Sequence, residues 1–173
     1  MSSDIPQSHP IRAFFTAVIH DAAAKEFGPT ADELMERYLT DLLVRFLHRD
    51  SVFSIRDPLG TRLTTIGDML LEGDVTLNAN SFERERQVHR HIGDTILFWS
   101  GVYPEFLRRL KSAHESEATI DYLAQAEDSY AIVSSFDHPP FEHESVFFAR
   151  LSRNVVPAIH VLQAARGMLG PNP

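Results

Sequence analysis

Apolar residues recur every three or four positions over much of the chain, which is the spacing of one helix face. Residues 10–27 follow this pattern and are stopped by a Gly-Pro pair, so they predict a first helix. Residues 30–47 predict a second helix, because Thr30 and Glu33 have the spacing of a capping box and a long apolar stripe follows them.

The pattern changes after Asp50. A short β-favouring run from Val52 to Ile55 precedes the sequence Asp-Pro-Leu-Gly at 57–60, which suits a type I turn. We therefore expect a small β-hairpin that returns through residues 62 and 63. A short helix should follow, capped by Thr64 or Thr65 and ended near Gly73.

The next helix begins at Asn80 or Ser81, with an amphipathic first half (RERQVHRH) and an apolar second half (ILFW). A helix of this composition is expected to run into the centre of the fold. Pro104 marks a break near its end, and Ser116 is a candidate cap for a further helix that ends near residue 136. The last helix is rich in aromatic and aliphatic residues, and Pro157 should kink it.

These elements predict an all-α fold, namely a single up-and-down bundle of about five or six helices with a small β-hairpin insert. The 173 residues, 43% of them hydrophobic, are enough for one sizeable core, and no repeat or long linker divides them. We therefore expect one domain over residues 1–173.

Composition narrows the function classes. The net charge of −8 repels phosphate backbones and anionic lipids, and no apolar run approaches the ~20 residues of a membrane-spanning helix. We expect neither nucleic acid nor a membrane as partner. The chain has no cysteine, so histidines, carboxylates and hydroxyls must carry any chemistry. The N-terminal MSSDIPQSHP lacks the features of a secretory signal, which favours a cytoplasmic location.

Four ionisable residues share faces with predicted core positions. They are Glu85, His89, Glu127 and Glu144. Buried carboxylates need a partner, a proton or a metal, and oxygen and imidazole ligands on facing helices suit iron, manganese or zinc. The paired Glu-x-x-His segments of di-iron bundles are missing, however. An ion pair, for example with Arg49, or simple solvation at the helix starts are the alternatives.

Two further pairs have i,i+3 spacing, namely His91 with Asp94 and His114 with Glu117. The first pair lies off the main apolar stripe and the second lies near a helix start. We therefore expect both pairs to form ordinary surface contacts.

Aromatic residues gather around the predicted break at Pro104. Trp99 and Tyr103, with Tyr130 supplying a polar group from the next helix, are candidates for binding a flat cofactor or ligand between helices. The alternative is that these side chains only fill the core where the helix bends.

The segment FERERQVHRHIGDTILFWSGVYPE, residues 82–105, resembles a group of uncharacterised bacterial proteins in which a similar helix precedes a proline-marked turn. The resemblance implies an all-helical bacterial domain, and no activity is attached to that group.

Motifs for a phosphate-binding glycine loop, a nucleophile elbow or a His-Glu-x-x-His zinc pair are absent from the sequence. The sequence therefore favours a noncatalytic soluble helical module that acts through self-association or a protein partner. The alternative is an enzyme or carrier that binds a metal or a small ligand in the bundle core.

Overall fold

The computed structural model describes residue 6 and residues 8–170, apart from the side chain of residue 49. Helices dominate these residues, so the predicted all-α class is confirmed. Their bounds are α1 Pro10–Phe27, η1 Gly28–Thr30, α2 Glu33–Phe46, α3 Arg49–Val52, α4 Ile66–Gly73, α5 Phe82–Val102, α6 Pro104–Ala113, α7 Glu115–Ala118, α8 Tyr122–Ser134, α9 Glu142–Ser152 and α10 Val155–Met168.

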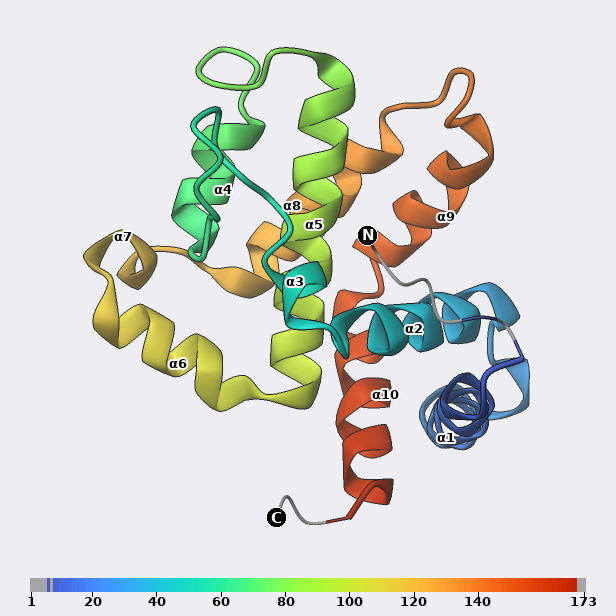
Figure 1. Ribbon diagram of the computed structural model, residues 1–173. Coiled ribbons are helices and arrows are strands. Elements are labelled where there is room, and N and C mark those ends of the chain that lie inside the picture. The colour runs from blue at the N-terminus through green and yellow to red at the C-terminus, as the bar shows by residue number, and fades with distance from the viewer. Residues whose placement is uncertain (1–5, 7, 171–173) are drawn as a thin grey trace.

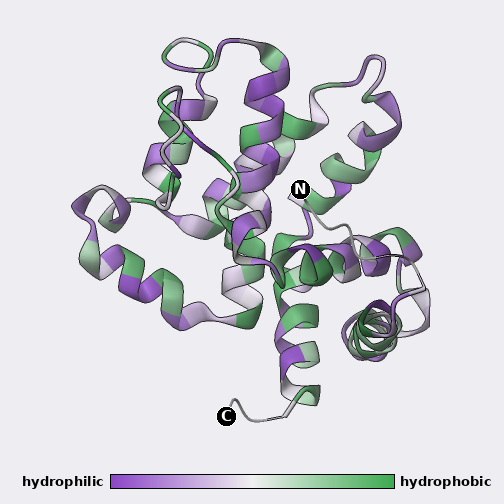
Figure 2. Cartoon of the chain, in the orientation of Figure 1, coloured by the Kyte–Doolittle hydropathy of each residue, from purple (hydrophilic) through white to green (hydrophobic). Residues whose placement is uncertain are grey.

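Helix α5 lies at the centre of the fold, as its composition predicts. Helices α4, α8 and α10 all pack against it, and Figure 1 shows its first half flanked by α4 on one side and α9 on the other. The first turns of α5 are hydrophilic, as their purple colour in Figure 2 shows. Because several helices surround α5, polar residues on more than one of its faces are buried.

The helices do not share one axis. Helix α1 packs on α2 and α10, yet Figure 1 shows α1 nearly end-on while α10 lies in the plane of the view. The arrangement therefore departs from the expected up-and-down bundle. It also contains more helical segments than the five or six expected, because breaks divide two of the predicted helices, α6 is a separate helix that begins at Pro104, and the short helix α3 precedes the expected hairpin.

The helix starts follow capping chemistry, although not always at the predicted residue. Ser81 caps α5 by accepting a hydrogen bond from the Arg84 amide, and Thr65 caps α4 in the same way. By contrast, α2 is capped by Asp32 instead of Thr30, and α8 by Asp121 instead of Ser116. Each capping side chain satisfies an amide that has no partner within its helix.

The predicted last helix is two helices, α9 and α10, with the break at residues 153 and 154. Pro157 is the third residue of α10 and does not kink it. The first four amides of a helix have no partner within that helix, so a proline is tolerated there.

The predicted hairpin is not formed as paired strands. Asp57 and Gly60 close the expected turn through a backbone hydrogen bond of 3.0 Å, and Gly60 takes a φ of 84°, which glycine adopts without strain. Across the part of the chain that the structure describes, the only β pairing is one isolated antiparallel bridge between Arg56 and Arg62.

No helix among the described residues is both long enough and apolar enough to cross a membrane.

Candidate functional site

A cleft of about 710 Å³ opens beside the first half of α5. Four arginines line it, together with His91 and residues of the segments before α4 and before α9. These four define what we call the arginine cleft: Arg45 of α2 and Arg84, Arg86 and Arg90 of α5. Its volume is within the usual range for small-ligand sites.

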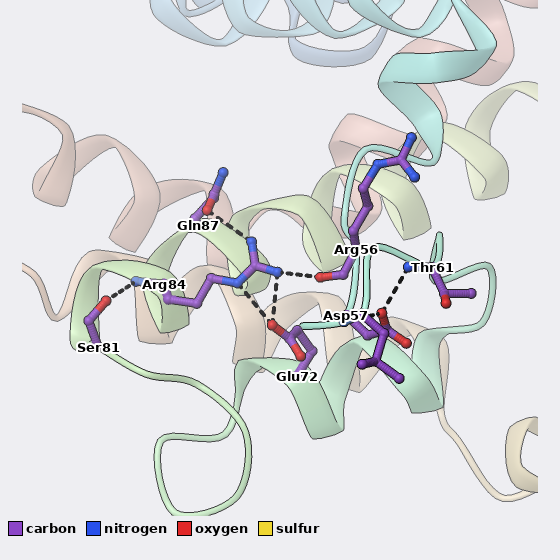
Figure 3. Close-up of polar contacts among 8 residues, drawn as sticks. Arg56, Asp57, Thr61, Glu72, Ser81, Arg84 and Gln87 are labelled. Atoms are coloured by element: carbon purple, nitrogen blue, oxygen red, sulfur yellow. Dashed lines mark hydrogen bonds and ion pairs between the residues drawn. The ribbon is translucent and has the colours of Figure 1, made fainter.

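Arg84 serves mainly to hold the walls of the cleft together (Figure 3). Its guanidinium donates to Glu72 Oε1 of α4 at 2.9 and 3.1 Å, and to the carbonyl oxygen of Arg56 at 2.7 Å. A further contact of 3.1 Å reaches Gln87 one turn along α5. Arg84 therefore fastens α5 to α4 and to the segment between α3 and α4.

Arg86 and Arg90 are held from the other side of the cleft by α9. Both form ion pairs with Glu144, and the Arg90 Nη1 to Glu144 Oε2 distance is 3.8 Å. Arg86 also lies over the ring of Phe141, with its guanidinium carbon 4.0 Å from the ring centre. The buried Nε atoms of Arg86 and Arg90 have no hydrogen-bond acceptor among the described residues.

Asp94 forms the floor of the cleft and is completely buried. The hydroxyls of Tyr38 and Tyr130 donate to its Oδ1 at 2.5 and 2.8 Å, and Arg45 Nη2 donates to Oδ2 at 2.8 Å. These partners come from α2 and α8, so the network ties both helices to α5. A buried carboxylate with three donors is the arrangement that its desolvation requires.

The electrostatics of this network favour an ionised Asp94. Burial by itself would raise the pKa of Asp94, but the positive charges of Arg45 and Arg90 and the hydrogen bonds from Tyr38 and Arg45 together hold that pKa below its ordinary value. Burial, together with the nearby Asp94 charge, raises the pKa values of Tyr38 and Tyr130, so both hydroxyls stay protonated and able to donate.

The four predicted metal ligands do not form a metal site. The described residues contain no group of three or more His, Asp or Glu side chains that could hold a metal ion. His89 is buried as expected, but its Nδ1 lies 3.2 Å from the hydroxyl of Ser129. Glu144 instead pairs with arginines, while Glu85 and Glu127 are only partly buried. In the described part of the chain these four side chains therefore do not come together, and metal binding stays a prediction.

The alternative prediction, an internal ion pair, describes Glu144 correctly, but its partners are Arg86 and Arg90. The side chain of Arg49, which we expected in this role, lies outside the described residues.

The three predicted cofactor-binding residues lie outside the arginine cleft. Trp99 stacks on Phe106 with ring centres 4.1 Å apart, and Tyr103 lies 6.4 Å from Trp99. Tyr130 is fully buried, bound to Asp94, and none of the three lines the arginine cleft. Tyr130 lies in the core and Trp99 packs against it, which agrees with the alternative that aromatic side chains fill the core near the bend.

Sequence reasoning missed the burial of three residues that it assigned to surface pairs. His91 is 7% exposed, and its Nε2–H donates a hydrogen bond of 2.8 Å to the Val52 carbonyl oxygen. Asp94 and Glu117 are completely buried. Glu117 accepts from the Gly67 amide at 2.6 Å. The available signal was the amphipathic first half of α5, RERQVHRH, whose arginines were assigned to no site.

No protein-family model matches the chain, and comparison with curated proteins and with solved structures gives no match. The resemblance of residues 82–105 to a bacterial group stays a prediction.

Proposed function

We propose that the protein binds a small anionic ligand, one that carries a phosphate or carboxylate group, in the arginine cleft. The observation that carries the proposal is the convergence of four arginines on one cleft in an acidic protein. Guanidinium groups present five donors each in a fixed fork that matches carboxylates and phosphates. This proposal develops the small-ligand alternative of the sequence analysis.

The four arginines already form ion pairs with acidic residues, so a ligand anion must compete with one of these residues for its arginine partners. Asp94 is buried and committed to its three donors, and the Glu72 side chain is 7% exposed. The Glu144 side chain, by contrast, is 48% exposed and is held only at its carboxylate end, by Arg86 and Arg90. We propose that the ligand anion takes the place of the Glu144 carboxylate.

The surrounding charge favours a small ligand over a polyanion. Electrostatic interactions in solution decay over about 8–10 Å at physiological salt, so a small anion in the cleft responds mainly to the arginines. A long polyanion would extend over the rest of a surface whose net charge is −8.

The test is calorimetric titration with inorganic phosphate at fixed ionic strength. Because a half-exposed ion pair contributes at most about 1 kcal/mol, Glu144→Gln should tighten phosphate binding about two- to fivefold. Arg90→Gln should weaken it about tenfold through loss of a charge-assisted hydrogen bond.

Glu105→Gln is the matched control, because Glu105 is 47% exposed and pairs with Arg108 on α6, outside the residues that line the cleft. Its phosphate affinity should equal that of the wild type. If Glu144→Gln and Glu105→Gln bind phosphate alike, or if the wild type binds none, the proposal is overturned.

The prediction of a noncatalytic module that associates with itself or with a protein partner is compatible with this ligand role. Side chains such as Leu77 and Phe82 are 61% and 69% exposed, and such apolar exposure is its main support. Association, like the cytoplasmic location and the lack of a nucleic acid partner, stays a prediction.

A further inference from the structure

A second depression adjoins the arginine cleft between α2, α5 and α9. It has a volume of about 220 Å³, and its apolar lining consists of Leu34, Tyr38, Phe147 and Phe148. We call this depression the aromatic groove. A volume below the ~300 Å³ of small ligand sites indicates a subsite for part of a ligand.

Arg90 belongs to both the arginine cleft and the aromatic groove. Its guanidinium carbon lies 5.7 Å from the ring centre of Tyr38 and 5.3 Å from that of Phe148. Glu144, which pairs with Arg90, lines the aromatic groove and does not line the arginine cleft. The charged pair Arg90–Glu144 therefore marks the border between the two spaces.

The floor of the aromatic groove is fixed by ring packing. Phe147 lies 5.0 Å from Tyr38 and 5.4 Å from Phe148 between ring centres. Tyr38 is anchored because its hydroxyl is bound to Asp94. At the rim, Leu34 is 51% exposed, so it presents apolar surface to water. An apolar ligand group that covered this surface would remove it from water.

We propose that the ligand is an amphiphilic anion, whose oxyanion headgroup enters the arginine cleft in place of the Glu144 carboxylate while its apolar chain lies along the aromatic groove. This inference rests on the proposed function and adds the chemical class of the ligand's other end. The ligand is a single dissolved molecule. A bilayer is disfavoured, because a net charge of −8 repels the anionic lipids that would supply such headgroups.

The first arm of the experiment compares ligands on the wild-type protein. Calorimetry would measure the affinities of inorganic phosphate, ethyl phosphate and octyl phosphate, the last below its micelle concentration. Each buried methylene adds to the affinity, so octyl phosphate should bind at least about tenfold more tightly than inorganic phosphate. Vesicles that contain phosphatidic acid should not bind.

The second arm uses two matched variants of α2. Leu34→Ser should weaken octyl phosphate binding about fivefold, through lost apolar contact, and leave inorganic phosphate unchanged. Leu47→Ser is the control, because Leu47 is 50% exposed at the C-terminal end of the same helix and does not line the groove. It should leave both affinities unchanged.

The outcomes separate this inference from the proposed function. If inorganic and octyl phosphate bind equally, or if Leu34→Ser and Leu47→Ser behave alike, the amphiphilic ligand is refuted while the anion site stands. Binding to the vesicles without binding to monomeric octyl phosphate would also refute it, in favour of a membrane surface. If neither phosphate compound binds, the anion site itself is refuted.

Discussion

In the ion pair of Arg45 and Asp94, we expect substitution of Arg45 to lower the free energy of unfolding more than substitution of Asp94 does. Arg45→Met leaves a completely buried carboxylate that keeps the two tyrosine donors and the nearby charge of Arg90. Removing one partner of a buried ion pair costs about 3–5 kcal/mol, and the remaining donors place this change near 3 kcal/mol.

Asp94→Asn should cost less. The asparagine oxygen can still accept from both tyrosine hydroxyls at the Oδ1 position, whereas its amide cannot accept from Arg45. The Arg45 side chain is 38% exposed and can recover water, so the cost is that of one charge-assisted hydrogen bond, about 2 kcal/mol.

The double variant Arg45→Met/Asp94→Asn should lose only about 3 kcal/mol, because no unpaired charge stays buried. The resulting coupling energy is about 2 kcal/mol. The matched cycle on the exposed pair Arg108 and Glu105 should give a coupling below about 0.5 kcal/mol.

The assay is urea unfolding followed by circular dichroism at pH 7 and fixed salt, which yields the free energy of unfolding of each variant. A coupling for Arg45 and Asp94 no larger than that of the surface pair would refute the reasoning. So would an Asp94→Asn variant that is less stable than Arg45→Met.

Three further outcomes follow from the structure. Because the pKa of Asp94 in the folded protein lies below its ordinary value of 3.8, the stability that its ionised form contributes is present above about pH 4 and is lost as pH falls through the folded pKa. The stability difference between the wild type and Asp94→Asn should therefore shrink as the pH falls below about 4. A difference that stays constant would contradict this. Gly101→Ala should lower the free energy of unfolding by about 1–3 kcal/mol, because the added Cβ would lie 2.4 Å from Leu162 Cβ. The control Gly167→Ala adds a Cβ that meets no atom within 4 Å, so it should be neutral or stabilising in thermal unfolding. Glu117→Gln should lower the free energy of unfolding by about 1–3 kcal/mol in the same measurement, because an amide NH2 group, which only donates, replaces one of the two oxygens that accept hydrogen bonds. A change below about 0.5 kcal/mol would show that these bonds are dispensable.

The sequence by itself determined the helical class and most of the helices. The helices over 10–27 and 82–102, the caps at Thr65 and Ser81, and the central place of α5 all follow from local signals. Periodicity and capping depend on residues within one or two turns, so they can be found without knowledge of the fold.

Burial on α5 was only partly predictable. A single apolar stripe identifies one buried face, and it placed His89 correctly. Asp94 lies on another face, which is buried because helices α2 and α8 supply Tyr38 and Tyr130 to it. How many sides of a helix are covered depends on its neighbours, which its own sequence does not specify.

Only the tertiary structure decided the candidate site. Arg45 meets Asp94 across 49 positions of sequence, and Arg86 meets Glu144 across 58. Contacts of this kind depend on the angles at which helices cross and on the break between α9 and α10. A small rotation of one helix against another changes which side chains face each other. The local pattern supplied the arginines and carboxylates, but the packing of α2, α5 and α9 turned them into one cleft with an adjoining apolar groove.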